Sequence, residues 1–267
     1  MSDAEPQPGE SDALDPARAR AVQAALGLKS DICAGMALPA FFHQIYFWDP
    51  QPPATLGRDG HPKPGIGLIP DTGLPRRMWA GGRLWFDAPL LAGVPAQRRS
   101  RVLQTVHKSG RSGPLAFVTL GHEIWQDGAV VLREEQDLVY RTDPAPEAPR
   151  APVPQARRDE TEARTVTFDA TLLFRYSALT FNGHRIHYDE SYARGVEGYD
   201  GLVVHGPLLA QLLMLMADTP RRPLRTFAFR ATAPLMHHET ATLCRNGPDA
   251  WVRGPQGRQC LVATLTT

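Results

Sequence analysis

Residues 206–217 of the chain read GPLLAQLLMLMA. Proline suits the first turn of a helix, so Pro207 predicts a helix with Gly206 near its N-cap. Leucine and methionine fill most of the positions that follow and leave almost no polar face. A helix that is apolar on one stripe lies at a surface, whereas a helix that is apolar all round must be enclosed. We therefore expect other elements to surround this helix.

Segments rich in β-forming residues are the candidates for that enclosure. Their partial alternation of apolar and polar residues favours antiparallel strands. A curved antiparallel sheet wrapped around a central helix, the hotdog arrangement, would bury the helix; an α+β domain with a half-buried helix is the alternative. The segments are SRVLQTVHK (100–108), GPLAFVTLGHEIW (113–125) and AVVLREEQDLVY (129–140), and then LRTFAFRATAPL (224–235), TATLCRNG (240–247) with AWVRG (250–254), and RQCLVATLTT (258–267).

The chain is predicted to consist of two halves with a similar plan. Residues 143–164 are rich in proline, alanine and charge and offer little to bury, so they are interpreted as a linker. Residues 1–142 and 165–267 would then each form a hotdog half, a buried helix followed by an antiparallel meander. The predicted fold class is α+β, a double hotdog with its two sheets joined edge to edge.

Composition excludes several classes of function. The chain carries 29 Lys plus Arg against 28 Asp plus Glu, so no overall field favours nucleic acid or a membrane as partner. The three cysteines form no CxxC pair, and the acidic, polar N-terminal residues differ from a signal peptide. The longest apolar run, near 202–217, is too short to span a bilayer. A cytoplasmic protein is expected.

Residues 181–189, FNGHRIHYD, gather polar chemistry shortly before the apolar helix. His187 is the best candidate for a general acid and base, because an imidazole titrates near neutrality. The Asn182 amide can orient a water molecule but cannot carry a proton. One of His184 and His187 would be catalytic, and the other could be structural. Arg185 could pair with an acidic neighbour or bind a substrate anion.

The start of the predicted helix offers a second functional group. Backbone N–H groups at a helix start lack partners and lie at the positive end of the dipole, so Gly206 could stabilise a developing enolate oxygen. His205 precedes it and is a candidate substrate contact. Metal binding through His184 and His187, with Asp189 and His205 nearby, is the rival interpretation, but no HExxH or comparable spacing occurs. No metal site is expected.

The stretches FNGHRIHYD and GLVVHGPLLA (201–210) resemble the MaoC-like, or type 2, hydroxyacyl-thioester dehydratases. In the family pattern, Ser-Gly-Asp-x-Asn-Pro-Ile/Leu-His, Asn182 stands at the catalytic Asp and His187 at the catalytic His. Gly206 matches the helix-start glycine that holds the thioester carbonyl. The departure at Asn182 implies that His187 carries most of the proton transfer.

The longer stretch FRYSALTFNGHRIHYD (174–189) resembles a branch that includes mitochondrial-type dehydratases and bacterial mesaconyl-C4-CoA and itaconyl-CoA hydratases. Segments of the first half, LGRDGHPKPG (56–65), LPRRMWAGGRLWF (74–86) and REEQDLVYR (133–141), favour the bacterial hydratases. This resemblance implies one active site per chain, an acyl-CoA substrate, no cofactor beyond the CoA of the substrate, and a homodimer.

The resemblance implies reversible hydration of a short, branched, dicarboxylic enoyl-CoA to citramalyl-CoA or a close relative. A free carboxylate on the substrate needs an arginine; the candidates are Arg76, Arg77, Arg83 and Arg185, which could equally contact a CoA phosphate or lie at the surface. A dehydratase for straight-chain acyl-CoA or acyl-ACP thioesters and a non-catalytic acyl-CoA-binding protein are the alternatives. A thioesterase is disfavoured, because no acidic residue lies within 207–217.

Overall fold

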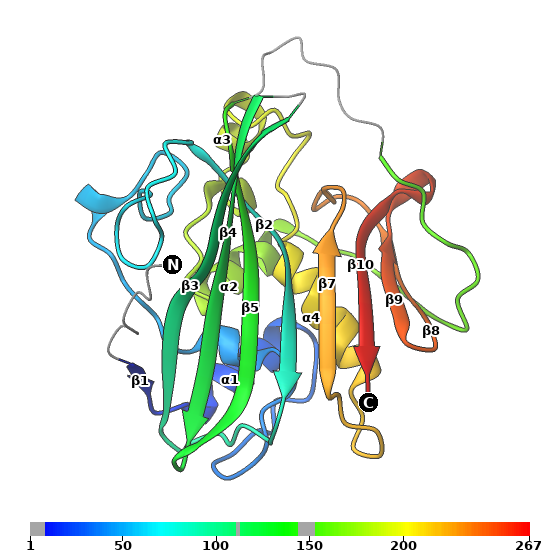
Figure 1. The fold of residues 1–267 in the computed structure, drawn as a ribbon. Coiled ribbons are helices and arrows are strands. Elements are labelled where there is room, and N and C mark those ends of the chain that lie inside the picture. The colour runs from blue at the N-terminus through cyan, green and yellow to red at the C-terminus, as the bar shows by residue number, and fades with distance from the viewer. Residues whose placement is uncertain (1–8, 111–112, 144–152) are drawn as a thin grey trace.

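Ten strands of the described residues form one continuous antiparallel sheet (Figure 1). The structure, a computed structural model, describes residues 9–110, 113–143 and 153–267. The N-terminal half contributes, in sheet order, β1 (Glu10–Asp12), β3 (Ala96–Gly110), β4 (Gly113–Gln126), β5 (Ala129–Arg141) and β2 (Arg76–Phe86). The C-terminal half continues the order with β7 (Thr226–Ala231), β10 (Gln259–Thr266), β9 (Asp249–Arg253), β8 (Ala241–Asn246) and β6 (Glu162–Val166).

The two halves join where β2 pairs with β7, from Gly81 opposite Arg230 to Trp85 opposite Thr226. Glycine makes this close pairing possible. A Cβ atom at Gly81 would lie 2.4 Å from the carbonyl oxygen of Phe229, well inside contact distance. The predicted edge-to-edge junction is therefore present, and it lies in the middle of the sheet.

The apolar stretch forms α4 (Gly206–Ala217), as predicted, and the sheet encloses it. Figure 1 shows α4 lying across the sheet behind β2 and β7. Leu208, Leu213 and Met214 are fully buried, and they pack in a core with Phe227 of β7 and Leu261 of β10. Burying side chains of this size contributes about 1.5–3 kcal/mol each. The fold is the predicted α+β double hotdog.

Among its described residues the N-terminal half has no helix as buried as α4, so the expectation of a buried helix in both halves was wrong. The aromatic stretch at 38–48 forms only a short 3-10 turn, η1 (Phe42–Ile45). Phe41 and Phe47 flank this turn with left-handed backbones, at φ 71° and 57°. Helix α1 (Pro16–Ala25) begins after Asp15, whose side chain accepts a hydrogen bond from Ala17 N, but it buries only Ala19, Val22 and Gln23.

Capping residues mark the starts of two further helices. Asp169 accepts a hydrogen bond from Leu172 N at the start of α2 (Ala170–Leu179), and Asp189 accepts one from Tyr192 N in α3 (Glu190–Gly195). Three further 3-10 turns are η2 (Pro53–Thr55), η3 (Arg185–His187) and η4 (Pro255–Gly257).

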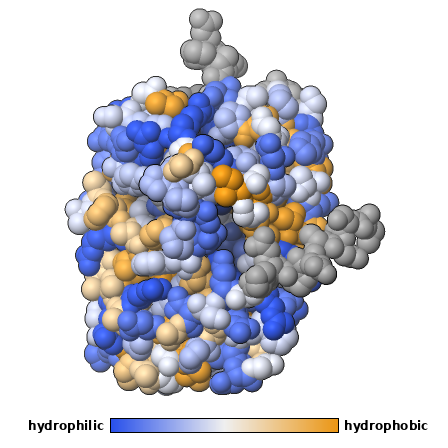
Figure 2. Space-filling model, turned by 90° about the vertical axis from the view of Figure 1, so that its left-hand side faces the viewer, coloured by the Kyte–Doolittle hydropathy of each residue, from blue (hydrophilic) through white to orange (hydrophobic). Residues whose placement is uncertain are grey.

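Strand β6 begins inside the segment interpreted as a linker and pairs with β8 at the sheet edge. The division into 1–142, 143–164 and 165–267 stays a prediction. Within the described ranges, no helix has the length and apolar character needed to cross a membrane. Figure 2 shows one face of the molecule, on which hydrophilic side chains predominate and hydrophobic ones gather in separate groups.

Candidate active site

A cavity of about 220 Å³ lies between β2, the 182–187 segment and the start of α4. Both halves of the chain line the cavity, because β2 of the N-terminal half pairs with β7 of the C-terminal half. Six of the predicted site residues meet there: Asn182, His184, His187, Gly206, Arg76 and Arg77. These residues are far apart in the sequence, so the fold itself assembles the site.

A tight turn after α2 brings the polar segment to the cavity. Phe181 adopts a left-handed backbone at φ 52°, and Asn182 N donates to the Ser177 carbonyl at 2.8 Å. The Asn182 Oδ1 atom then accepts from His184 N at 3.0 Å. This bond commits the amide oxygen to the turn and leaves the NH2 group available to the cavity.

His187 is held as a neutral base. Its Nδ1 lies 2.7 Å from the Val203 carbonyl oxygen, which can only accept, so Nδ1 carries the proton. The ring is buried, and burial lowers the pKa of His187 to about 4. At neutral pH the ring is therefore uncharged, and its Nε2 lone pair is free to take a proton.

His205 lies behind His187, and it is absent from the residues that line the cavity. The two rings stack with centroids 3.6 Å apart and planes inclined by 20°. His205 is fully buried, and a hydrogen bond of 2.8 Å joins its Nε2 to Ser177 Oγ on α2. Burial, with smaller effects of His187 and His184, lowers the pKa of His205 well below its usual value. His205 therefore supports the His187 ring by stacking against it. Because Gly206 directly follows His205 in the sequence, this contact also holds His187 beside Gly206.

Gly206 opens the start of α4 to the cavity. No side chain caps this end, and the proline that follows has no N–H to offer. A Cβ atom at Gly206 would meet nothing closer than the Trp79 carbonyl oxygen at 4.0 Å. A ligand can therefore approach the Gly206 backbone, where the helix dipole favours negative charge.

The two arginines of the cavity differ in their partners. Arg76 is buried, and its guanidinium lies 2.5 Å from Glu197 Oε2. Arg77 is half-buried, and no carboxylate among the described residues lies within ion-pair distance of it. The pKa of His184 falls to about 2, chiefly through burial and then through the charges of His187, Arg77 and Arg76.

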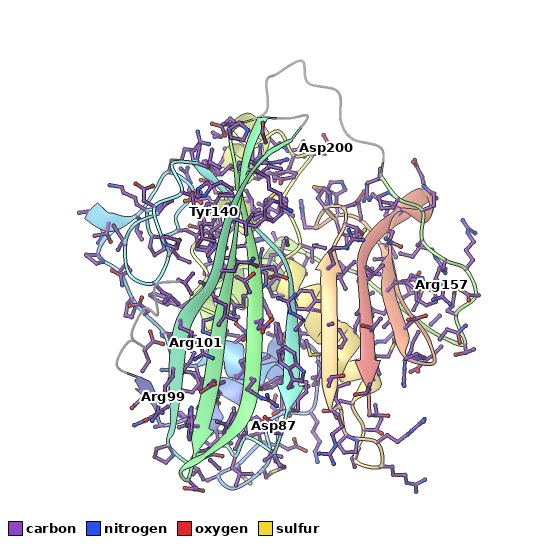
Figure 3. The ribbon with its side chains drawn as sticks, viewed as in Figure 1. Asp87, Arg99, Arg101, Tyr140, Arg157 and Asp200 are labelled. Carbon is purple, nitrogen blue, oxygen red and sulfur yellow. The ribbon has the colours of Figure 1, made fainter. Side chains whose placement is uncertain are left out.

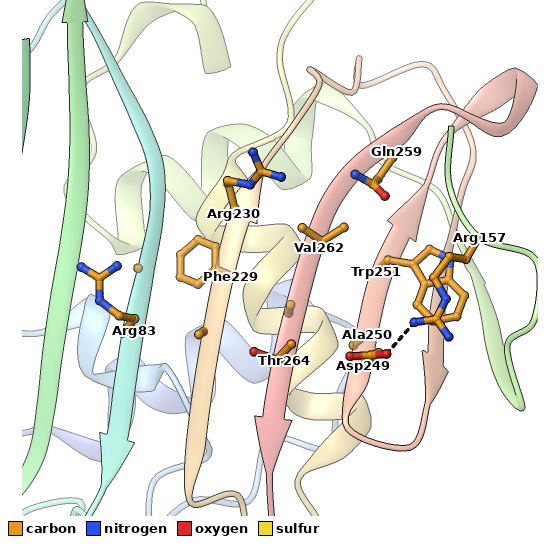
Figure 4. A pocket seen from close by; sticks show the side chains of 13 residues that line it. Arg83, Arg157, Phe229, Arg230, Asp249, Ala250, Trp251, Gln259, Val262 and Thr264 are labelled. Atoms are coloured by element: carbon orange, nitrogen blue, oxygen red, sulfur yellow. Dashed lines mark hydrogen bonds and ion pairs between the residues drawn. The ribbon is translucent and has the colours of Figure 1, made fainter. Parts of the chain in front are cut away.

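Two other predicted arginines lie outside the cavity. The Arg185 guanidinium pairs with Asp189 at 2.7 Å and lies over the Tyr192 ring at 4.2 Å, which is the structural ion pair that the sequence allowed. Arg83 pairs with Asp137 at 2.7 Å and with Glu135 at 2.6 Å. It borders a shallow groove on the sheet surface, across from the Arg157–Asp249 pair (Figure 4).

His61 is a cavity residue that the sequence reasoning did not identify. Its ring lies 4.8 Å from the His184 ring, and burial and the nearby Arg77 charge lower its pKa well below the usual value. The loop that carries it packs directly on the catalytic segment: Arg185 N donates to Asp59 O at 2.8 Å. A long Pro/Gly-rich loop at 50–75 was the available signal, since such loops are often functional.

His61 and Asn182 also line a second, wider groove of about 470 Å³. Aromatic side chains dominate its wall, with Trp48 and Phe181 stacked at a centroid distance of 5.1 Å. Phe174 and Phe181 are more than half exposed there. The groove adjoins the cavity through the two shared residues.

Metal ligation is not favoured by the side chains that the structure describes. No group of three or more His, Cys, Asp or Glu residues among them is arranged to hold a metal ion. His187 Nδ1 is occupied by a carbonyl, and His205 Nε2 is occupied by a hydroxyl. The expectation of no metal and no cofactor stays a prediction.

Residues 41–237 match the family model of hydroxyacyl-thioester dehydratase type 2, and the chain belongs to this family. It is 46% identical over 255 residues to the mesaconyl-C(4)-CoA hydratase of Chloroflexus aurantiacus, covering 92% of this chain and 91% of that protein. It is also 31% identical over 119 residues to the mitochondrial hydroxyacyl-thioester dehydratase type 2 of Saccharomyces cerevisiae, covering 44% of this chain and 42% of that one.

Solved structures share the fold. HtdX from Mycobacterium tuberculosis has a TM-score of 0.69 at 15% identity, covering 96% of this chain and 98% of its own. A MaoC-like dehydratase from Phytophthora capsici has a TM-score of 0.70 at 12% identity, covering 98% of this chain and 96% of its own. At these identities the likeness concerns the fold alone.

Proposed function

We propose that the protein reversibly hydrates a short, branched enoyl-CoA that carries a second, free carboxylate, of the mesaconyl-C4-CoA type, to give citramalyl-CoA. The observation that carries the proposal is His187, held neutral with Nε2 free beside the open start of α4. The 46% identity to a protein named for this reaction supports the choice of substrate.

The reaction needs one water molecule and one base. Asn182 positions the water through its NH2 group, and His187 Nε2 removes a proton as the hydroxyl bonds to the β-carbon. The electron pair of the double bond moves onto the thioester oxygen, where the Gly206 N–H stabilises the enolate. His187 then returns the same proton to the α-carbon, so no net proton is gained or lost. The adjoining aromatic groove offers surface for the CoA arm.

Replacing His187 tests this role. His187→Gln keeps a group that can donate to the Val203 carbonyl but cannot exchange protons. Hydration of mesaconyl-C4-CoA, followed as loss of enoyl-thioester absorbance, should fall by roughly 10²–10⁴-fold, the usual contribution of a general base. The thermal midpoint should stay close to that of the wild type. The exposed His107→Gln on β3 is the matched control and should retain full activity.

A substrate panel tests the reaction itself. Purified protein is given mesaconyl-C4-CoA, itaconyl-CoA and crotonyl-CoA, with a thiol reagent to detect free CoA. Preference for crotonyl-CoA would favour the straight-chain dehydratase that the family name suggests. Release of CoA without hydration would indicate a thioesterase, and no turnover of any thioester would indicate a binding protein.

We further propose that the reaction needs no metal or other cofactor, so dialysis against a chelator should leave turnover unchanged. The homodimer and the cytoplasmic location stay predictions. Light scattering of the purified protein measures the first.

A further inference from the structure

The charged groups of the cavity decide what a substrate can bring into it. Arg76 and Glu197 are both buried, and the Arg76 guanidinium donates to the Glu197 carboxylate and to its backbone oxygen, at 2.5 and 3.0 Å. Tyr192 OH also donates to the Glu197 carboxylate, at 3.2 Å. The two charges balance each other, so the pair adds no net charge to the cavity, although the buried Arg76 Nε has no hydrogen-bond partner among the described residues.

The histidines of the cavity add none either. Burial lowers the pKa of His187 to about 4 and is the main reason that the pKa of His184 falls to about 2. Burial also lowers the pKa of His61 well below its usual value. All three rings are neutral at physiological pH, and they can exchange hydrogen bonds but not balance a charge.

Arg77 is the remaining charged group among the described residues that line the cavity. It lines the cavity together with His61 and His184, and its charge contributes to the lowered pKa of both rings. Burial raises the pKa of the Asp59 carboxyl, and the positive charge of Arg77 acts in the opposite direction with a smaller effect. The charged atoms of the two side chains nevertheless lie more than 4.0 Å apart and form no ion pair. Asp59 is itself occupied, accepting from His61 N at 3.1 Å. Among the described residues no carboxylate forms an ion pair with this half-buried cation, and an unpaired cation is costly to bury, so an anion entering the cavity would relieve that cost.

We propose that Arg77 binds the free carboxylate of the substrate's acyl group and thereby selects dicarboxylic over uncharged enoyl-thioesters. This inference rests on the proposed function. It selects one of the four arginines that the sequence offered as binders of a substrate carboxylate. The planar guanidinium matches a carboxylate with two parallel hydrogen bonds. Arg76 is a positioning residue that ties β2 to the loop containing Glu197.

A CoA phosphate is the other anion that an arginine could bind. Arg77 lines the same 220 Å³ cavity as His187 and Gly206, which act on the thioester and its double bond. The phosphates lie at the opposite end of the pantetheine arm from that thioester. An acyl carboxylate therefore fits the position of Arg77, and a phosphate does not.

Four substrates separate these anions in the full-length protein. Mesaconyl and crotonyl groups are each supplied on CoA and on N-acetylcysteamine, which lacks phosphates. In Arg77→Gln, the ratio of kcat/KM for mesaconyl over crotonyl should fall on the order of 10²-fold with both thiols, as when one partner of a buried charge pair is removed. Arg77→Lys should recover part of that ratio. The exposed Arg101→Gln on β3, labelled in Figure 3, is the control and should leave the ratio unchanged.

Equal losses for both acyl groups would overturn the assignment, and a loss confined to the CoA thioesters would show a phosphate contact instead. Binding of succinyl-CoA and butyryl-CoA by calorimetry gives a readout that does not depend on hydration. Wild type should prefer succinyl-CoA, and Arg77→Gln should lose that preference. If neither enoyl-thioester is hydrated but this preference is seen, the proposed function fails and the role of Arg77 stands.

Discussion

A single hydrogen bond to the Val203 carbonyl decides which nitrogen of His187 can act as a base. The identity of residue 182 then decides the charge around that base. An aspartate, as in the family pattern, would place a carboxylate beside the ring and raise its pKa. It would also repel the carboxylate of a dicarboxylic substrate. An asparagine avoids both effects, so the departure from the pattern agrees with an anionic acyl group.

The variant Asn182→Asp tests this account of the charge. The Asp oxygen can still accept from His184 N, so the turn should persist while the NH2 donor is lost. We expect kcat on mesaconyl-C4-CoA to fall roughly 10²-fold, a usual penalty for misplacing a reacting group. The acid limb of kcat/KM should move upward from a wild-type value near the His187 pKa of about 4. Near-normal activity with an unchanged acid limb would contradict this division of roles.

At the scale of elements, α4 combines two properties that rarely meet in one helix. Its body is enclosed by the sheet, whereas its first turn opens onto a cavity. A change at the first turn can therefore affect chemistry without disturbing the core. The buried part of the helix begins at Pro207, directly after Gly206.

Gly206→Ala should separate the two properties. The added methyl group meets no atom closer than 4.0 Å in the folded chain, so the thermal midpoint should change little. The same methyl group occupies the space from which a thioester oxygen reaches the backbone N–H. We expect kcat/KM to fall about 10²–10³-fold, as when an oxyanion donor is lost. Gly195→Ala at the end of α3, where a Cβ atom also meets no neighbour, is the control; equal effects of both variants would refute the interpretation.

At the scale of the whole molecule, buried neutral histidines make the fold sensitive to acid. Burial lowers the pKa of His187 and of His122 to about 4, and of His184 to about 2. The unfolded chain takes up these protons near pH 6.5, before the folded chain does. The lowered pKa values of these histidines leave the free energy of unfolding unchanged above pH 6.5, and they reduce it as the pH falls toward 4. For His187 alone the loss amounts to about 3 kcal/mol.

Thermal unfolding measured between pH 7 and pH 4 checks this expectation. The midpoint should fall steadily below pH 6.5, the usual pKa of histidine. His122 does not line the cavity, and its Nδ1 lies 2.8 Å from Ser100 Oγ. In His122→Gln the fall should be shallower than in the wild type, with hydration unchanged at neutral pH. A midpoint that is constant over this range would show that the rings are not neutral when buried.

Sequence patterns predicted the elements that local rules determine. The helix predicted at 206–217 depends on its own apolar residues and Pro207, and it was confirmed. The sequence could not distinguish Arg77 from Arg83, because the difference lies in partners on other strands. The predicted catalytic roles of Asn182, His187 and Gly206 still await the experiments above.

Three features depend on contacts between distant parts of the chain rather than on local sequence. The stretch at 38–48 is apolar enough in sequence to suggest a buried helix. In the structure Phe41 and Phe47 adopt left-handed backbones that interrupt any helix, while the stretch packs in a hydrophobic core. Strand β6 is exposed along most of its length, so it has no alternating pattern to detect. The contact of His61 with the catalytic segment depends on a loop more than a hundred residues away.

Gly60 and Gly183 meet backbone against backbone, where a Cβ atom on either would lie 2.1 or 2.6 Å from the other's carbonyl oxygen. No side chain separates the first half of the molecule from the catalytic turn at this point. The C-terminal half carries the whole signature motif. One wall of the cavity is nevertheless formed by a loop of the N-terminal half that is distant in the sequence. Grafting that motif onto another hotdog scaffold would transfer the reacting groups and leave their enclosure behind.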